Sequence, residues 1–414
     1  MTPAITNAPA CGPVPTLSSL LSPVEPDAFF DEYFERGPLH VARGEPRFFG
    51  DVYDIAELEA TLDVGARHVE QFAMTKGGET LDRDAITIER RSVRSRYTGK
   101  PPLLVIDPRA VASRFESGYT LLIKDAASFS PRLQALCNRL QTDLESYVQA
   151  NVYFTPPRAQ GFALHHDTHD TLILQIEGTK TWRVHQPAVE LPIETQPYAK
   201  GEHGACSAAP RELTLEPGDT LYLPRGFRHE AATAQSRSLH VTLALLPLRV
   251  IDLVEGALQF AAVSQVELRR ALPRGWHLDP TFPDRFAAQV TAQLARELRG
   301  ACVRAARDLV CNDAFAVTRT VADEIFANLD RLAAAGPDST VSLRGEAPFL
   351  VRDRHTSVQV VAAGKAVSLP IACAPLLERL RRGPATLAEV DRILPDAGRS
   401  LLTMLVTDGI AAIG

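Results

Sequence analysis

Two short motifs hold side chains that together could bind a divalent metal ion. The first is His165-His166-Asp167, and the second is the run from Leu223 to His229, which contains a Pro-Arg-Gly turn. Residues two positions apart on a strand share a face, so His165 and Asp167 would point together and His166 away from them. With His229 from a distant strand, they would form a facial triad of two imidazoles and one carboxylate. Such a triad holds Fe(II) and leaves positions open for a cosubstrate and oxygen.

The charge of such a site indicates what it would bind. Two neutral imidazoles and one carboxylate leave Fe(II) with a net charge of about +1, which favours an anionic chelating ligand. Lys180 begins a strand-like run after Gly178-Thr179 and could pair with a carboxylate at the far end of that ligand. A lysine beside a turn is more often exposed to solvent, so its position alone leaves this role open.

The spacing also leaves other interpretations of the first motif open. A His-x-Asp pair is more often a surface feature than a metal site. His169 and Asp170 are near enough in the sequence to provide an alternative set of ligands. The metal site therefore depends on a fold that brings residues 165–167 and 229 into one cavity.

The segment around both motifs has the pattern of an antiparallel barrel or jelly roll. Short runs rich in β-branched and aromatic residues are separated by Gly, Pro and Asp. These runs cover residues 152–154, 171–177, 181–185, 214–215, 220–223, 229–233 and 239–246. Leu172-Ile173-Leu174 is apolar on both faces, which predicts a strand that is covered on both sides.

Helical periodicity is found on both sides of this β-rich segment. Short helices are expected from Leu17 to about Asp63, and a helix is expected between Ser130 and Ala150. The apolar residues that predict the second helix recur every three or four positions: Leu133, Leu136, Leu140, Leu144 and Val148. After the β-rich segment, amphipathic helices are predicted over residues 250–271, 282–299 and 313–334.

The last part of the chain has the proportions of a winged helix. A strand is predicted at residues 357–361, followed by short helices near 376–382 and 387–393 and an apolar run at 401–406. Its basic and acidic residues nearly balance, whereas nucleic-acid binding would need a clearer basic face, so a packing role is favoured.

Composition excludes several classes of protein. The chain has 414 residues, 45% of them hydrophobic and 23% charged, which is typical of a soluble globular protein with more than one domain. Its net charge of -6 gives no general attraction to nucleic-acid backbone. The 6 cysteines show no C-x-x-C spacing, which argues against a zinc ribbon or a disulfide framework and favours the cytosol. Residues 1–15 lack basic residues and an apolar run, so we expect a loose tail rather than a signal peptide or anchor.

Four motifs, in the right order and in register, resemble the JmjC-domain ribosomal oxygenases. They are Asn151 to Pro157, Gln160 to Asp167, Leu174 to Val184, and Leu223 to His229. The match is dense across roughly residues 118 to 247. It implies a double-stranded β-helix of the cupin type that uses Fe(II), 2-oxoglutarate and O2 to hydroxylate protein side chains.

The resemblance also implies roles for individual residues. His165, Asp167 and His229 match the iron ligands, and Lys180 matches the lysine that binds a carboxylate of 2-oxoglutarate. Oxidation of 2-oxoglutarate to succinate would be coupled to hydroxylation of a C–H bond. No general acid or base is needed for removal of the hydrogen atom, so the protein's task is to position the target carbon and exclude water.

Further polar residues are expected in the cosubstrate and substrate pocket. They are Asn151, Tyr153, Ser238 and His240, the last two sharing one face of the last barrel strand. The sequence departs from the family pattern at Leu164, where Pro is usual, at His166, where Tyr is usual, and at Glu230, where Gln is common. None of these departures removes a ligand, but they leave the substrate open.

The expected architecture is therefore an α+β chain with four parts. They are a disordered tail at 1–16, a JmjC/cupin catalytic domain at 17–247, a helical dimerisation segment at 248–338 and a winged-helix-like domain at 339–414. Apolar residues of the helical segment could pack against a second copy or against the chain's own barrel, and the resemblance favours a homodimer.

Three functions compete on this basis. The leading one is hydroxylation of a protein or peptide side chain, with a ribosomal protein expected from the family and a small biosynthetic peptide still open. The others are N-methyl-lysine demethylation and a non-catalytic cupin that binds a metal or small acids. We expect a cytoplasmic protein with no membrane partner and no direct nucleic-acid partner.

Overall fold

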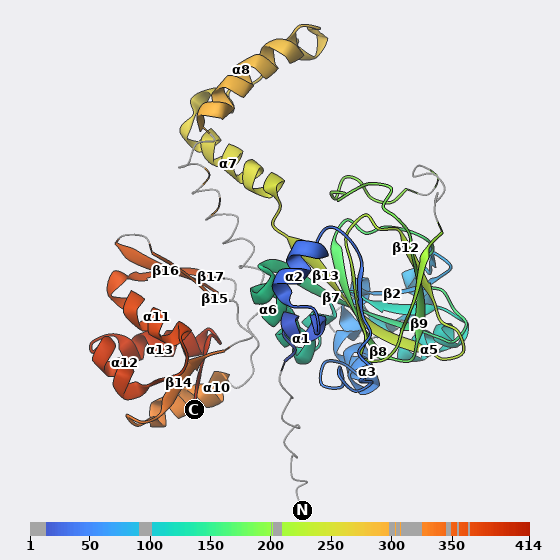
Figure 1. Ribbon diagram of the computed structural model, residues 1–414, viewed down its shortest axis with the longest axis horizontal. Coiled ribbons are helices and arrows are strands. Elements are labelled where there is room, and N and C mark those ends of the chain that lie inside the picture. The colour runs from blue at the N-terminus through green and yellow to red at the C-terminus, as the bar shows by residue number, and fades with distance from the viewer. Residues whose placement is uncertain are drawn as a thin grey trace, which may run out of the picture. The chain divides into compact units, whose positions relative to one another are not determined.

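The computed structural model describes most of the chain as two compact units. The described residues are 14–90, 102–199, 201, 209–297, 303, 307, 325–344, 349–353, 356–362 and 365–414. The predicted tail at 1–16 thus lies outside them apart from residues 14–16. One unit comprises residues 1–144 and 148–246, and the other comprises 145–147 and 247–414. Figure 1 shows both, coloured along the chain.

The first unit is built on two antiparallel sheets. The larger has the strand order β1-β11-β8-β13-β7-β6-β2-β3, and the smaller β10-β9-β12. The strands of the larger sheet are β1 Leu39–Val41, β2 Phe72–Lys76, β3 Glu79–Thr80, β6 Thr120–Ile123, β7 Ser146–Thr155, β8 Asp170–Glu177, β11 Thr220–Leu223 and β13 Ser238–Pro247. Those of the smaller sheet are β9 Lys180–Val184, β10 Arg211–Leu215 and β12 His229–Ala232. A separate hairpin pairs β4 Thr87–Arg90 with β5 Leu103–Ile106.

The two sheets face each other across an apolar layer. Ile173 and Leu221 of the larger sheet belong to the same buried cluster as Trp182 and Leu215 of the smaller one. Helices cover the opposite face of the larger sheet, where Leu172 and Leu174 join the main core. These helices are α1 Leu17–Leu21, α2 Pro26–Glu32, α3 Ile55–Val64, α5 Pro108–Glu116 and α6 Pro131–Leu144. The prediction that Leu172-Ile173-Leu174 is covered on both sides is confirmed, because all three are at most 1% exposed.

The predicted helix between Ser130 and Ala150 is too long. It ends at Leu144, Glu145 adopts a φ of 49°, and β7 begins at Ser146. Val148 fits both patterns because it lies four residues after Leu144. Residues four apart share a face of a helix, and residues an even number apart share a face of a strand. Along β7 buried residues alternate with partly buried ones, so Val148 is a strand residue.

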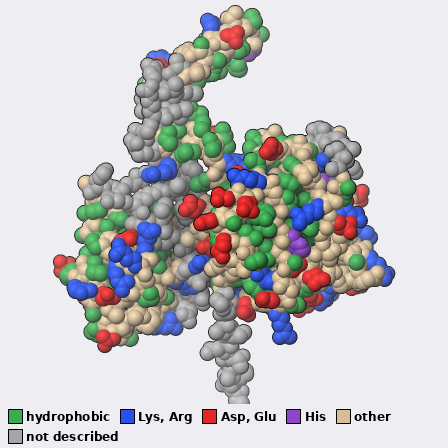
Figure 2. Space-filling model, viewed as in Figure 1, with side chains coloured by type: hydrophobic (Ala, Val, Ile, Leu, Met, Phe, Trp, Pro, Cys, Tyr) green, Lys and Arg blue, Asp and Glu red, His purple; other side chains and the backbone are tan. Residues whose placement is uncertain are grey.

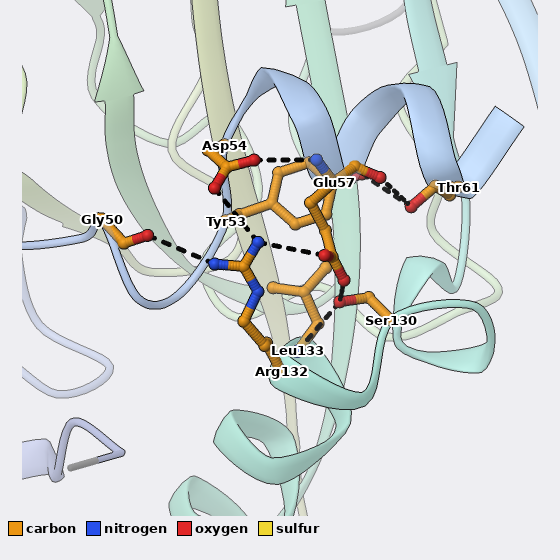
Figure 3. Close-up of polar contacts among 8 residues, drawn as sticks. All are labelled: Gly50, Tyr53, Asp54, Glu57, Thr61, Ser130, Arg132 and Leu133. Atoms are coloured by element: carbon orange, nitrogen blue, oxygen red, sulfur yellow. Dashed lines mark hydrogen bonds and ion pairs between the residues drawn. The ribbon is translucent and has the colours of Figure 1, made fainter. Parts of the chain in front are cut away.

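A polar cluster joins the starts of α3 and α6 (Figure 3). Arg132 donates through Nη2 to Asp54 at 3.1 Å and to Glu57 at 3.0 Å. Asp54 caps α3 by accepting the N–H of Glu57 at 2.8 Å, and Ser130 accepts the N–H of Leu133 at the start of α6. One guanidinium thus bridges two carboxylates and holds two helix N-termini that have orphan backbone donors.

The second unit begins with helices α7 Val250–Ser264 and α8 Phe282–Glu297. The predicted helix over 250–271 is thus also too long, because a short 3-10 turn at Val266–Arg269 follows an extended Gln265. Of the helix predicted at 313–334, α10 Ile325–Ala334 is present, and residues 313–324 lie outside the described part of the chain.

The C-terminal part has its own apolar core of helices and small sheets. Its sheets have the orders β18-β14-β19 and β15-β16-β17. The elements are β14 Thr340–Leu343, β15 Phe349–Asp353, β16 Ser357–Ala362, β17 Lys365–Pro370, α11 Ala374–Arg381, β18 Ala385–Thr386, α12 Leu387–Ile393, α13 Gly398–Thr407 and β19 Ala411–Ile413. The strand and helices predicted here from residue 357 onward are confirmed. None of the helices in the described ranges combines the length and apolar character needed to cross a membrane.

Candidate metal centre

Three side chains from two distant segments converge in the first unit. His165, Asp167 and His229 each offer one ligand atom, and these atoms all lie within 4.8 Å of one another. Nε2 of His165 is 3.8 Å from Oδ1 of Asp167, and Nε2 of His229 is 3.6 Å from Oδ2. Both separations exceed a hydrogen bond, so the carboxylate is not hydrogen-bonded to either nitrogen and all three groups are available to a metal ion.

Hydrogen bonds orient both imidazoles. The backbone N–H of His229 donates to the backbone carbonyl of His165 at 2.7 Å, and the backbone N–H of His165 donates to the backbone carbonyl of His229 at 3.1 Å. Nδ1 of His165 lies 2.8 Å from the carbonyl oxygen of Ala163, and Nδ1 of His229 lies 3.0 Å from that of Phe227. A carbonyl accepts, so Nδ1 carries the proton and Nε2 directs its lone pair toward the site, as a metal ligand requires.

The surroundings hold His229 and Asp167 in the protonation states that metal binding needs. Burial, with the neighbouring His165, lowers the pKa of His229 to about 4, so this imidazole is neutral at physiological pH. Burial alone would raise the pKa of Asp167, but His229 and His165 bring it below its ordinary value. The site therefore presents a neutral nitrogen from His229 and an ionised carboxylate from Asp167.

The backbone of the first motif differs from the strand assumed for its spacing. His165 forms an isolated antiparallel bridge with His229, and β8 begins only at Asp170. This bridge places the two ligand residues directly opposite each other. His229 begins β12 after the Pro-Arg-Gly turn, as predicted.

The neighbouring polar residues are occupied elsewhere. His166 is 4% exposed, with Nε2 3.3 Å from the carbonyl oxygen of Gln196 and its ring edge-on to Tyr198. The carboxylate of Asp170 accepts two hydrogen bonds from Arg225. His166, His169 and Asp170 are outside the group of three ligands, so the alternative ligand set has no support in the described residues.

Lys180 begins β9 and is buried, with 5% exposure. Its Nζ donates to Oγ1 of Thr155 at 3.0 Å, and that hydroxyl is 3.2 Å from Oγ1 of Thr120. Burial lowers the pKa of Lys180 to about 7, and no carboxylate in the described part of the chain offsets that effect. A buried ammonium without a counter-ion is costly, so the pocket is suited to an anionic ligand.

The ring of Trp182 lies close to both Lys180 and one candidate metal ligand, His229. Its ring centroid is 5.9 Å from Nζ of Lys180 and 5.8 Å from the ring of His229. His240 lies edge-on to Trp182 at 5.6 Å and stacks on Tyr153 at 4.8 Å with an interplanar angle of 2°. Lys180 and the candidate ligand His229 therefore both lie within 5.9 Å of the same indole ring.

Two polar atoms around this ring lack partners among the described residues, namely Nε1 of Trp182 and Nδ1 of His240. Burial, together with the charge of Lys180, lowers the pKa of His240, so its ring is neutral. Buried polar groups are normally hydrogen-bonded, so these two atoms, beside a lysine with no acidic partner among the described residues, indicate a site for a polar ligand.

Asn151 and Ser238 are engaged with other parts of the chain. Oδ1 of Asn151 accepts the N–H of Asp125 at 3.0 Å, and Oγ of Ser238 accepts from Nε2 of Gln175 at 2.9 Å. Their predicted place in the cosubstrate pocket stays a prediction.

Two pocket residues received no role in the sequence reasoning. Thr155 lies two residues beyond Tyr153 on β7, and Trp182 lies two residues beyond Lys180 on β9. Residues two apart on a strand share a face, so the position two residues after Tyr153 and the position two residues after Lys180 could have been predicted to face the same pocket.

Comparison with known families accords with this geometry. Residues 125–253 match the JmjC domain family. The chain contains a JmjC domain. Its JmjC domain contains all three candidate metal ligands and Lys180.

Curated relatives of this JmjC-domain protein are oxygenases by name. Human ribosomal oxygenase 1 is 33% identical over 305 residues, which cover 67% of this chain and 44% of that protein. The bifunctional lysine-specific demethylase and histidyl-hydroxylase NO66 of Drosophila willistoni is 30% identical over 270 residues, covering 62% and 33%. The alignments thus span less than half the length of these relatives.

A solved structure shows the same fold as this JmjC-domain protein. It is YcfD, a ribosomal oxygenase from Escherichia coli, in complex with cobalt and 2-oxoglutarate. The TM-score is 0.51 at 18% identity, covering 94% of this chain and 97% of YcfD.

Proposed function

We propose that the chain is an Fe(II)- and 2-oxoglutarate-dependent oxygenase that hydroxylates an amino-acid side chain of a protein or peptide. The observation that carries the proposal is the pairing of two features around one indole ring. One is the group of His165, Asp167 and His229, whose ligand atoms lie within 4.8 Å of one another. The other is the buried Lys180, which has no acidic partner in the described ranges.

The residues fit the chemistry that this function requires. Two neutral nitrogens and one carboxylate are the donor set of facial-triad iron sites. With O2 and 2-oxoglutarate, iron in such a site supplies the oxidising power for C–H hydroxylation. Lys180 would hold the distal carboxylate of 2-oxoglutarate by a charge-assisted hydrogen bond. The aromatic rings of Trp182 and Tyr153 would exclude water from the reacting atoms.

The remaining pocket residues are proposed to line the same cavity. Tyr153 and His240, stacked on each other, would form one wall, and the unpartnered Nδ1 of His240 would face a polar ligand atom. Asn151 and Ser238 would fix this wall through their contacts with Asp125 and Gln175.

The comparisons support a ribosomal protein as the substrate. The human relative is named ribosomal oxygenase 1, and YcfD is described as a ribosomal oxygenase bound to cobalt and 2-oxoglutarate. The net charge of -6 suits a basic protein or peptide partner and gives no attraction to nucleic-acid backbone.

We expect the protein to convert 2-oxoglutarate to succinate and to add one oxygen atom to a polypeptide. The test is incubation with Fe(II), ascorbate, 2-oxoglutarate and a host lysate, followed by intact-mass analysis of small basic proteins and peptides. His229→Ala is the control because it removes one ligand. Identical mass profiles and identical succinate for both proteins would contradict the proposal.

The same assay separates the competing functions. NO66 is named as a lysine-specific demethylase as well as a histidyl-hydroxylase, and demethylation would release formaldehyde. A non-catalytic cupin would bind iron without forming succinate. Formaldehyde and succinate are therefore measured together.

A homodimer is proposed through the helical segment. Phe260 and Val263 of α7 share a helix face and are 42% and 74% exposed. An apolar hollow of ≈ 680 Å³ lies between α7 and α8. Exposed apolar surface of this kind is typical of protein interfaces.

We expect light scattering after size exclusion to give a dimer for the wild type and a monomer for Val263→Glu. A charge placed on an apolar interface is buried without a partner, which disfavours association. The matched control is Val64→Glu on α3, since Val64 is 65% exposed and lies in the other unit. A dimer that survives Val263→Glu would contradict this interface.

Residues 339–414 are proposed to form a winged-helix-like packing module. Support comes from the three helices α11, α12 and α13 with the sheet β18-β14-β19 beside them. In this module Arg379 pairs with Glu389, and Arg399 pairs with Asp391. Figure 2 shows basic and acidic side chains interspersed on its surface.

A cytoplasmic location is proposed from the cysteine pattern, and Cys137 and Cys373 are free and buried.

A further inference from the structure

We infer that Arg225 is a positioning residue for the metal centre and acts through Asp170 and Glu35. The inference rests on the proposed function, because it concerns the same ligands. Arg225 lies in the turn between β11 and β12, four residues before His229. Asp170 begins β8, three residues after Asp167. An interaction between Arg225 and Asp170 therefore joins the two segments that carry the ligands.

Three hydrogen bonds make this connection. Oδ1 of Asp170 accepts the backbone N–H of Arg225 at 2.7 Å, and Oδ2 accepts from Nη1 at 3.2 Å. The N–H of Gly226 donates to the backbone carbonyl of Asp167 at 3.0 Å. The backbone of 167–170 is thus held along the turn that leads into His229.

The turn has little freedom to adopt another conformation. Gly226 has a φ of 89°, in the left-handed region that favours glycine. A Cβ atom at this position would lie 2.3 Å from the carbonyl oxygen of Val189. The close backbone approach and the Asp170 contacts define the path of the chain into His229.

Glu35 extends the network to the N-terminal helices. Its Oε1 lies 2.6 Å from Nη2 of Arg225, so the guanidinium bridges two carboxylates. Glu35 has a φ of 59°, which is unusual for a residue other than glycine, and its N–H donates to the hydroxyl of Tyr222 at 2.9 Å. A backbone held in a sparsely populated conformation is a feature of functional regions.

The burial of the network favours positioning over a contribution to stability. Asp170 is 0% exposed and Arg225 is 6% exposed. Nε of Arg225 is buried and has no partner among the described residues. Buried ion pairs often contribute no net stability relative to apolar residues of similar size. The planar guanidinium, however, offers donors in fixed directions, which suits it to holding two segments in register.

The test compares Arg225→Met with Arg132→Met. Arg132 is a matched control because its guanidinium also bridges two carboxylates, Asp54 and Glu57, neither of which lies in a ligand-bearing segment (Figure 3). Co(II), a spectroscopic substitute for Fe(II), is titrated into each full-length protein. The dissociation constant and the visible absorption spectrum are measured, together with the melting temperature.

We expect Arg225→Met to weaken Co(II) binding by about 10- to 100-fold, the range for loss of residues that orient metal ligands. Its cobalt spectrum should also change, because the ligand geometry is altered. Arg132→Met should match the wild type in both readouts even where its melting temperature falls. Wild-type affinity and spectrum in folded Arg225→Met would overturn the inference. A wild-type protein that binds no Co(II) would instead overturn the proposed function.

If Arg225→Met does not fold, a second variant tests the positioning role of the network. Glu35→Gln removes one charge of the network at a residue whose side chain is 34% exposed, and it keeps the shape of the side chain. Weaker Co(II) binding by Glu35→Gln, with an unchanged melting temperature, supports the positioning role. Unchanged affinity and spectrum would overturn it.

Discussion

Asp167→Asn should reduce both Fe(II) affinity and succinate formation by at least about a hundredfold, because loss of a ligand costs more than loss of a residue that orients one. The substitution preserves shape but removes the one negative charge of the ligand group. Without that charge, two neutral imidazoles must hold a divalent cation in a site that is partly screened from water. Metal affinity is measured by titration and turnover by succinate release.

The matched control for Asp167→Asn is His169→Asn. His169 is in the same segment and was an alternative ligand in the sequence, but it lies outside the converging group. We expect this variant to bind iron and turn over as the wild type does. Iron loss in His169→Asn together with iron retention in Asp167→Asn would show that the ligand set is wrong.

Lys180→Met should raise the dissociation constant for 2-oxoglutarate by roughly a hundredfold or more, which corresponds to about 3 kcal/mol for a broken buried ion pair. Metal binding should persist, because Lys180 is not among the ligands. The melting temperature of the ligand-free protein should not fall, since the variant removes a buried cation that has no acidic partner in the described part of the chain. Isothermal titration and thermal unfolding separate these effects. Unchanged 2-oxoglutarate affinity would contradict the assigned role.

The pH dependence of binding provides a second readout for the same lysine. The pKa of Lys180 is about 7 in the free pocket, and a bound carboxylate would raise it. Below pH 7 the ammonium is already charged, whereas above pH 7 binding must first take up a proton. The apparent dissociation constant for 2-oxoglutarate should therefore rise with pH above about 7 in the wild type. This pH dependence should be absent in Lys180→Met.

Much of the barrel follows from local sequence patterns. The strands at 171–177, 220–223 and 229–233 are predicted within a residue or two, because alternation and turn residues are local signals. The residue types of the candidate metal ligands and the turn before His229 can also be recognised in the sequence, because they too are local signals. The strands between 72 and 123 were missed, since each is at most 5 residues long and a run that short shows little periodicity. The helix that ends at Leu144 was extended because Val148 fits both periods.

The available donors, their order along the chain and the short β-rich runs around them can all be read from local sequence patterns. The folded chain alone shows that His165 and His229 pair through a single bridge and that Lys180 is buried with no acidic partner among the described residues. The same holds for Arg225, which joins Asp170 to Glu35. The physical reason is that side-chain alternation depends on adjacent residues, whereas burial, desolvation and ion pairing depend on groups far apart in the chain. These non-local effects convert a common His-x-Asp pair into a candidate metal centre.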